Sequence, residues 1–242
     1  MSDTALSFAG VEKHYGRQQV LDGIDLDVAP GEFLALVGVN GAGKSTLLKC
    51  LLDFTSLDAG AIRIFDLAHE QTESRRNLAY LPEKFIPPYY LTGREFLTCM
   101  ARLHGVRPRA EAIRELLARR LDFDPAALAK PVRQLSKGMS QKLGLAACLL
   151  SGKPLLVLDE PMSGLDPKTR ACLKQYLLEL KGGGSTVFFS THMLADIEVL
   201  CDRAAILHGG VVRFIGTPRE CCDRYGTADF EAAYLQCVSA AA

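Results

Sequence analysis

The chain has 242 residues, of which 48% are hydrophobic and 23% charged, as in an ordinary globular protein with a core of its own. Its 28 basic residues balance 28 acidic ones. Domains that bind nucleic acid are usually basic, so this balance argues against a nucleic acid partner. No apolar run approaches the roughly 20 residues that a membrane-spanning helix needs. The eight cysteines form no CxxC pair, and Cys148 and Cys172 lie within helix-like apolar patterns, so we expect buried free thiols and a reducing compartment.

The first third of the sequence predicts β-strands. Apolar and polar side chains nearly alternate along residues 5–16 and 18–33, with Asp and Gly at the turns. An unbroken apolar run then follows at residues 33–38, which indicates a strand buried on both faces.

The middle of the chain changes to a helical pattern, from Thr92 to about Leu150. Residues 109–121 place one apolar stripe opposite a row of arginines, and this stripe holds Ala110, Ile113, Leu117 and Leu121. The preceding segment, residues 83–91, contains paired prolines that resist both a helix and a central strand.

Buried strands and helices alternate again after Gly152. A strand is predicted at residues 155–161, and a turn followed by a buried strand at 182–192. A helix that Asp166 caps is predicted at 167–180, a further helix at 193–201 and a hairpin at 203–216. This alternation predicts an α/β fold with a mostly parallel sheet, helices on both sides and an antiparallel β region at the N-terminus. The helical middle would be an insertion into that core.

The segment GVNGAGKST fits the Walker A pattern G-x-x-x-x-G-K-[ST] at every fixed position. It lies between a predicted buried strand and a predicted helix, which is the context that this phosphate-binding loop requires. Backbone N–H groups would face a phosphate, Lys44 would reach the β- and γ-phosphates, and the Ser45 hydroxyl would bind Mg²⁺. The expected nucleotide contacts are Gly38, Val39, Asn40, Gly41, Ala42, Gly43, Lys44, Ser45 and Thr46.

Two later strands end in residues suited to ATP hydrolysis. The run LLVLDEP ends in Asp159, which suits Mg²⁺, and Glu160, which suits a general base that polarises the attacking water. His192 follows the next buried strand, and we expect it to contact the γ-phosphate through its imidazole N–H.

A second helix start with phosphate-binding character lies at LSKGMSQKL, residues 135–143. The ordered set of the Walker A loop, LSKGMSQ, LLVLDEP, SGLD and STH resembles the ATP-binding subunit of ABC transporters over essentially the whole chain. The resemblance implies a P-loop NTPase of ABC type in which Ser136 and Gly138 bind the γ-phosphate of an ATP held by the opposite subunit. Two chains would pack head to tail around two ATP molecules.

The resemblance also implies roles for three other residues. Tyr15 would stack on adenine. Asp166 would contact the partner subunit, although capping its own helix is an equally sound role. Glu83 stands where the family commonly has Gln that touches Mg²⁺, and its carboxylate oxygen suits that ion as well. The signature segment has Lys137 and Met139 where the family commonly has Gly and Gln.

The resemblance therefore predicts a single ABC ATPase domain over residues 1–242, with a helical insertion at about 84–153 that carries the signature segment. The chain would bind and hydrolyse ATP with Mg²⁺ and power an integral membrane permease, on the pattern of ABC-2 type exporters. It would form a dimer, most simply with a second copy of itself, and lie peripherally at the cytoplasmic face of the membrane without nucleic acid. The cluster Phe85, Ile86, Tyr89, Tyr90 and Leu91 would dock the permease, or else pack the insertion onto the core.

Two other classes of protein share part of this pattern. A soluble ABC-type ATPase that acts as an assembly factor without a permease would carry the same motifs. A P-loop kinase would have no use for the signature segment or for SGLD.

Overall fold

The computed structural model describes residues 4–240. The chain divides into two compact units: unit 1 comprises residues 1–77 and 184–242, and unit 2 comprises residues 78–183. Within the described residues, no helix is long and apolar enough to cross a membrane.

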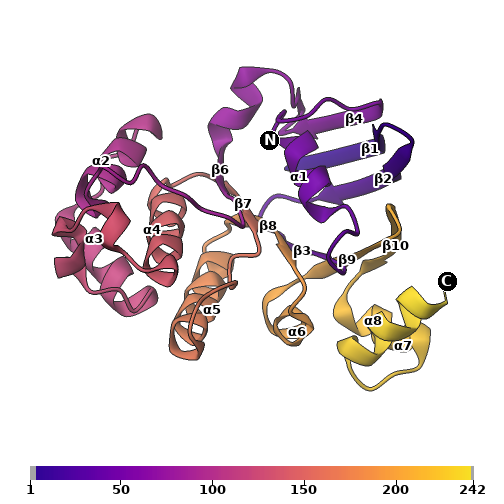
Figure 1. Cartoon of the computed structure of the whole chain (residues 1–242). Helices are drawn as coiled ribbons and strands as arrows, with labels where there is room; N and C mark the ends of the chain where they lie inside the picture. The colour runs from indigo at the N-terminus through magenta and orange to yellow at the C-terminus, as the bar shows by residue number, and fades with distance from the viewer. Residues whose placement is uncertain (1–3, 241–242) are drawn as a thin grey trace. The chain divides into compact units, whose positions relative to one another are not determined.

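Unit 1 contains an antiparallel sheet with the strand order β2-β1-β4-β5, of which β2, β1 and β4 are labelled in Figure 1. These strands are β1 (Leu6–Tyr15), β2 (Gln18–Val28), β4 (Ala59–Ile64) and β5 (Leu67–Ala68). Along β2, buried and exposed residues alternate toward its end, as expected for a sheet with one face on the core. The predicted N-terminal β region is therefore confirmed, whereas the short strands β4 and β5 were not predicted.

The second sheet region of unit 1 has the order β10-β9-β3-β8, made by β3 (Phe33–Val37), β8 (Thr186–Thr191), β9 (Arg203–His208) and β10 (Val211–Gly216). β3 runs parallel to both β8 and β9, and its five residues are all buried. β9 and β10 form the predicted antiparallel hairpin. The rings of Phe8 and Phe188, whose centroids lie 5.9 Å apart, join the two sheets of this unit.

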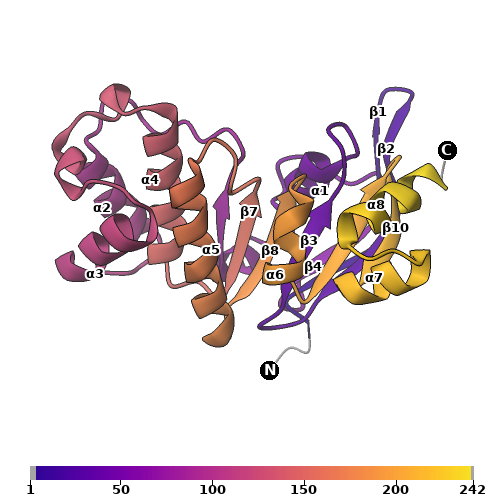
Figure 2. The same cartoon turned by 90° about the horizontal axis from the view of Figure 1, so that it is seen from below.

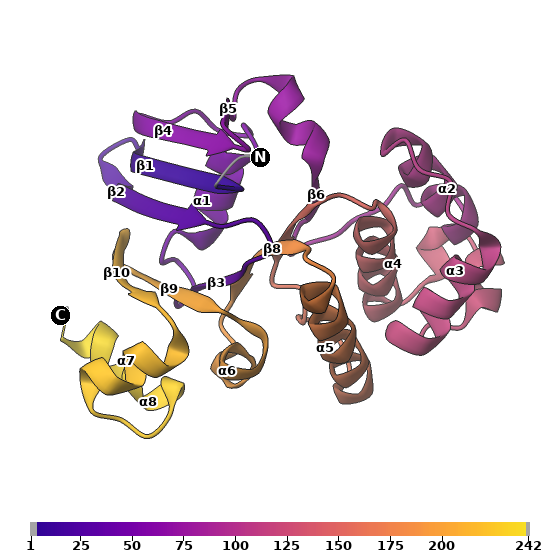
Figure 3. The same ribbon diagram turned by 180° about the vertical axis from the view of Figure 1, so that it is seen from behind.

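Helices complete unit 1. Helix α1 (Lys44–Leu51) follows the phosphate loop, and the predicted helix at 193–201 is a 3₁₀ turn, Leu194–Asp196, followed by α6 (Ile197–Leu200). Two further helices, α7 (Pro218–Tyr225) and α8 (Phe230–Ser239), pack side by side at the C-terminal end (Figure 3).

Unit 2 contains the parallel strands β6 (Leu78–Leu81) and β7 (Leu155–Asp159). Its main helices are α2 (Gly93–Leu103), α3 (Ala110–Glu115), α4 (Lys137–Leu150) and α5 (Pro167–Gly182). Figure 2 shows α2, α3 and α4 gathered together. Short 3₁₀ turns at Pro125–Ala129 and Val132–Gln134 connect α3 to α4. The helical pattern predicted for the middle of the chain is thus confirmed.

The apolar stripe predicted along residues 109–121 is only partly correct. Leu117 and Leu121 are fully buried, but Ala110 is exposed. The reason is that Ala110 and Ile113 lie on α3, none of whose residues is buried, and both line an open pocket of unit 2 and not a packed core. A π-helical turn, Leu116–Arg120, follows α3, and in it the Leu121 N–H donates to the Leu116 carbonyl at 3.1 Å.

Candidate nucleotide site

The predicted phosphate loop, residues 38–46, connects the buried strand β3 to the first turn of α1. Gly41 and Gly43 adopt left-handed φ angles of 86° and 110°, which L side chains rarely reach. Gly43 is the N-cap of α1, and no side chain caps that helix. The first N–H groups of α1 therefore have no side-chain cap, which is what an anion-binding helix start needs.

Two glycines of this loop also have no room for a side chain. A Cβ at Gly38 would lie 2.4 Å from the Leu207 carbonyl oxygen, and one at Gly43 would lie 2.9 Å from Val20 O. The backbone of the loop therefore packs directly against β9 and the start of β2. Its curled conformation depends on these two positions.

Lys44 lies at the base of the loop and is only 7% exposed. Its ammonium group donates to the carbonyl oxygens of Gly38, at 2.6 Å, and Val39, at 3.3 Å. These bonds hold the positive charge under the loop, where it fits a bound phosphate. Ser45 and Thr46 follow in the first turn and are partly exposed.

His192 emerges at the same edge of the sheet as the phosphate loop. In the parallel pairing of β3 and β8, Val37 lies opposite Thr191, so the two chain segments leave their strands side by side. His192 is exposed, and the Thr191 hydroxyl accepts a hydrogen bond from the Met193 N–H at 3.0 Å. The structure therefore brings the predicted phosphate loop and the predicted His192 together within unit 1.

Tyr15 ends β1 and is 49% exposed. The ammonium group of Lys13 lies 5.6 Å from the centroid of its ring. Lys13 is held in turn by Asp58, at 3.4 Å. An exposed ring with a fixed cation beside it suits the predicted stacking on a base.

Tyr234 of α8 contacts the phosphate loop, a feature that the sequence did not reveal. Its phenolic oxygen accepts a hydrogen bond from the Val39 backbone N–H. Burial raises the pKa of Tyr234 above its ordinary value, and the bond from Val39 opposes that rise. The C-terminal helix α8 is thereby attached to the second residue of the loop.

In unit 2, the predicted carboxylates lie at one edge of the β6–β7 pair. Leu81 lies opposite Leu158 in parallel register, so Glu83 follows β6 at the same edge where Asp159 ends β7. Burial raises the pKa of the Tyr80 hydroxyl, and the negative charges of Asp159 and Glu83 add to that rise. Both carboxylates therefore act electrostatically on the Tyr80 hydroxyl. Asp159 is buried, whereas Glu83 is exposed.

Glu160 has an unusual backbone, with φ at 50°, although it is not a glycine. A residue in this left-handed region costs about 1–3 kcal/mol of backbone strain and is often found at functional sites. Its carbonyl accepts a hydrogen bond from the Ser163 N–H at 3.0 Å, and its side chain is buried, at 7% exposure. The strained turn fixes the direction in which the Glu160 carboxylate leaves β7.

The signature segment begins α4 as predicted. Ser136 is the N-cap, and its hydroxyl oxygen accepts a hydrogen bond from the Met139 N–H at 3.2 Å, which leaves the hydroxyl proton as a donor. A Cβ at Gly138 would lie 3.3 Å from the Gly164 carbonyl oxygen. The SGLD segment therefore packs directly against the first turn of the signature helix.

Asp166 caps α5, as expected. Its carboxylate accepts bonds from the Thr169 N–H at 2.9 Å and the Thr169 hydroxyl at 2.7 Å. The hydroxyl bond from Thr169, with smaller effects from Lys142, holds the pKa of Asp166 well below its usual value. The Lys142 ammonium lies 3.3 Å from Asp166 Oδ2 and donates to the Asp122 carbonyl at 3.0 Å. Lys142 thus links the signature helix to the start of α5.

The residues predicted to bind Mg²⁺ offer only oxygen ligands: the Ser45 hydroxyl and the carboxylates of Asp159 and Glu83. Hard divalent cations prefer this donor set, and Mg²⁺ commonly takes one or two carboxylates together with phosphate oxygens and water. The chemistry of each of these oxygen donors therefore suits Mg²⁺. Within residues 4–240, no group of three or more His, Cys, Asp or Glu side chains is placed to hold a metal ion.

Comparison with known proteins agrees with this arrangement. The family model for ABC transporters matches residues 21–163. A daunorubicin resistance ATP-binding protein of Streptomyces coeruleorubidus is 39% identical over 224 residues, which cover 91% of this chain and 70% of that protein. The Nod factor export ATP-binding protein I of Rhizobium etli is 34% identical over 223 residues, again 91% of this chain and 70% of that protein.

A solved structure described as the ATP binding subunit of an ABC transporter superposes with a TM-score of 0.88. It is 34% identical in sequence, and the match covers 97% of this chain and 99% of that chain. The expected fold class, a P-loop NTPase of ABC type, is confirmed. The chain belongs to the ABC transporter family, as an ATP-binding subunit with ATPase activity.

Proposed function

We propose that this chain powers an exporter: two copies close head to tail around ATP, and the resulting motion drives an integral membrane permease. The names of the two relatives, which concern drug resistance and Nod factor export, support export as the direction. The chain would act as one ABC ATPase domain, with residues 84–153 as the helical insertion, bound peripherally at the cytoplasmic face through the permease.

The phosphate-binding roles fall to residues of unit 1. The loop from Gly38 to Thr46 binds the phosphates of ATP through its backbone and Lys44, and Tyr15 stacks on the adenine. His192 donates a hydrogen bond to the γ-phosphate. The observation that carries the proposal is the start of α1, which no side chain caps and whose first residue is the buried Lys44. His192 lies at the same sheet edge.

The hydrolytic roles fall to residues of unit 2. Glu160 takes a proton from the attacking water, and its strained, buried position fixes its orientation. Mg²⁺ neutralises charge on the phosphates when it is bound. Asp159 and Glu83 of unit 2 would be ligands of that ion, and Ser45 of unit 1 would be a further ligand.

The signature segment serves the ATP of the opposite copy. The Ser136 hydroxyl donates a hydrogen bond to the γ-phosphate, and Gly138 permits a close backbone approach to it. Asp166, which already caps α5, also contacts the partner subunit. This arrangement explains why a chain with one Walker A loop carries a second phosphate-binding helix start.

The permease would dock on an exposed apolar cluster in the segment after β6. Ile86, Tyr89 and Tyr90 are 85%, 66% and 72% exposed. Phe85, in contrast, packs on Phe96 with ring centroids 5.6 Å apart. The predicted cluster therefore divides into residues that pack inside unit 2 and residues that are available to a partner.

Affinity purification tests the proposal. The tagged chain is recovered from detergent-solubilised membranes of its host, and copurifying proteins are identified by mass spectrometry, with Tyr89→Glu/Tyr90→Glu as the matched variant. We expect a stoichiometric integral membrane protein with several spans, which the variant loses. Recovery of soluble proteins alone would contradict the exporter and favour an assembly factor without a permease.

A further inference from the structure

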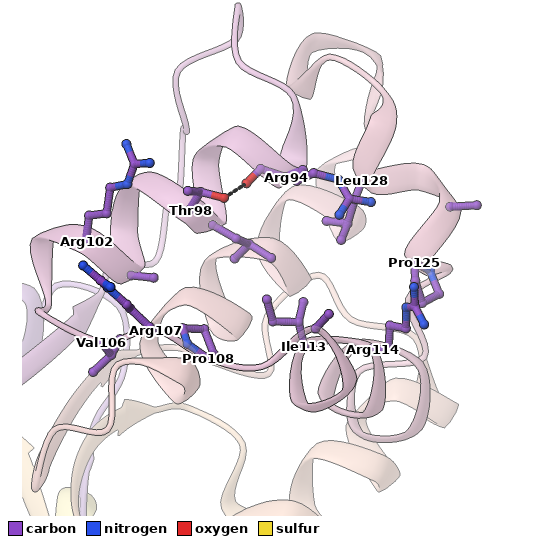
Figure 4. Close-up of a pocket in the computed structure, with 14 residues that line it drawn as sticks. Arg94, Thr98, Arg102, Val106, Arg107, Pro108, Ile113, Arg114, Pro125 and Leu128 are labelled. Carbon is purple, nitrogen blue, oxygen red and sulfur yellow. Dashed lines mark hydrogen bonds between the residues drawn. The ribbon is translucent and has the colours of Figure 1, made fainter.

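A pocket of about 900 Å³ lies within unit 2, between α2, α3 and the 3₁₀ turn Pro125–Ala129 (Figure 4). None of the residues that line it is among those predicted to bind ATP or Mg²⁺. This volume lies within the range of about 300–1,000 Å³ that is typical of small-molecule sites. The pocket is therefore large enough for a ligand of its own.

The lining of this pocket combines an apolar centre with arginines. Leu97 and Leu128 are buried, and Val106, Pro108 and Ile113 are half-buried. Four exposed arginines also belong to the lining: Arg94, Arg102, Arg107 and Arg114. In the view of Figure 4, Arg102 and Arg107 stand near Val106 at one end, and Arg94 and Arg114 near Leu128 and Pro125 at the other.

No acidic residue balances this charge in the lining. Of the acids near the pocket, Glu95 forms the capping box of α2 with Thr92, and Glu115 pairs with Arg119 at 3.6 Å. Glu111 of α3 is exposed and does not line the pocket. Four guanidinium groups around one pocket repel one another, and an anionic ligand would relieve that repulsion. Guanidinium groups also match carboxylate and phosphate oxygens in geometry.

We propose that this pocket binds an amphipathic organic anion, namely a phosphate monoester or carboxylate with an apolar body. The anionic group pairs with the arginines at an end of the pocket, and the apolar body covers Leu97, Ile113 and Leu128. Such a ligand could be a single-chain lipid or a water-soluble organic phosphate, and both share this chemistry. The proposal does not depend on the exporter function.

Isothermal titration calorimetry of the full chain with dodecyl phosphate, below its micelle concentration, tests the proposal. Saturating ADP is present throughout, so that the phosphate loop at residues 38–46 is occupied. We expect saturable binding at one site per chain and no saturable binding of dodecyl maltoside, which has the same apolar chain and no charge. The variant Arg94→Gln/Arg114→Gln should weaken binding at least about tenfold, since charge-assisted bonds are the strong ones. Arg109→Gln, an exposed arginine outside the pocket, is the matched control and should stay within about twofold.

The affinity for phenyl phosphate, compared with that for dodecyl phosphate, identifies the source of the ligand, and the affinity for inorganic phosphate tests the role of the apolar centre. Tighter binding of dodecyl phosphate than of phenyl phosphate indicates a lipid, and equal binding of the two indicates a soluble organic phosphate. Equal binding of inorganic phosphate would remove any role for the apolar centre and overturn the proposal. An equal loss in the Arg109→Gln control, or adsorption to anionic vesicles without binding of monomeric dodecyl phosphate, would also overturn it.

The variant Ile113→Ala tests the apolar centre independently of charge. It should weaken dodecyl phosphate binding but leave the binding of inorganic phosphate unchanged. Loss of the permease from copurification in Arg94→Gln/Arg114→Gln, without any change in dodecyl phosphate binding, would instead make the pocket a protein contact. Each variant should also unfold at the same temperature as the original chain, which would show that a loss of ligand binding does not come from misfolding.

Discussion

At the residue scale, Glu160 and Tyr234 act on the predicted site in different ways. Glu160 sits on a strained backbone directly after a buried strand and is itself buried. Tyr234 comes from the C-terminal helix and holds the second residue of the phosphate loop by one hydrogen bond. The first concerns the chemical step, and the second concerns how firmly the loop is held for ATP.

The substitution Glu160→Gln should lower ATP hydrolysis about 10²- to 10⁴-fold, the usual contribution of a general base. ATP binding should survive, because the amide keeps the size of the side chain. Steady-state phosphate release and binding of a fluorescent ATP analogue measure the two properties. Glu111→Gln, at an exposed position of α3, is the control and should retain normal activity. Retention of hydrolysis in Glu160→Gln would assign the general base to another group.

The substitution Tyr234→Phe removes the hydroxyl that accepts the Val39 bond but keeps the buried ring. A net hydrogen bond contributes about 0.5–1.5 kcal/mol, so the KM for ATP should rise about 2- to 10-fold with little change in kcat. Tyr90→Phe, an exposed tyrosine in unit 2, is the matched control for ATPase kinetics. An unchanged KM would show that α8 does not stabilise the loop.

At the element scale, the starts of two helices are joined in unit 2. Gly138 in the first turn of α4 packs closely on the Gly164 carbonyl, and Lys142 in the second turn pairs with Asp166 at the start of α5. Lys142 also holds the carbonyl of Asp122, whose φ of 45° is unusual for a non-glycine residue. The signature segment and SGLD therefore form one packed structure.

The substitution Lys142→Met should destabilise unit 2, because it removes both charge-assisted contacts of a nearly buried ammonium. Hydrogen bonds to charged groups contribute about 1.5–3 kcal/mol, and the expected fall in the unfolding midpoint is a few degrees. Lys142→Arg should restore much of it, and Lys130→Met, at an exposed position, should change little. Differential scanning calorimetry measures these shifts. Equal midpoints for Lys142→Met and Lys130→Met would show that this link contributes no stability.

Local sequence predicted those parts of the site that depend on short, fixed spacing. The Walker A loop, the Asp166 cap and the helix start at the signature segment follow from residues within a few positions of one another, so the sequence alone places them on the right elements. The bond from Val39 to Tyr234 could not be predicted, because the two residues are far apart in the chain and no local pattern links them. The π turn after α3 was equally hidden, since its side chains fit an ordinary helix.

At the scale of the whole molecule, the chain carries a complete Walker A loop and also a signature helix start. In the proposed mechanism, this helix start does not contact the ATP that the chain's own Walker A loop binds. In the mechanism that we propose, a head-to-tail dimer gives that helix start a role, and the exposed Ile86, Tyr89 and Tyr90 offer a docking surface for a permease. The proposed dimer interface and the proposed permease interface use different residues, so substitutions can test them separately.

The substitution Tyr90→Glu should uncouple the two functions. A carboxylate on an exposed apolar docking surface disfavours burial against the permease, whereas ATP hydrolysis by the isolated chain does not use this surface. Export by the assembled transporter should fall, and ATPase activity of the isolated chain should stay within about twofold of the original. Equal loss of both activities would indicate a folding role for Tyr90. Tyr90→Phe is again the control.

The mass of the Glu160→Gln chain in solution tests the central claim most directly. Light scattering after gel filtration, at saturating ATP and Mg²⁺, should give about twice the chain mass of 26.3 kDa, and removal of ATP should return the single-chain mass. Ser136→Arg in the same background, which blocks the helix start that faces the partner's ATP, should keep the single-chain mass throughout. A Glu160→Gln chain that stays at 26.3 kDa with saturating ATP would contradict the head-to-tail dimer.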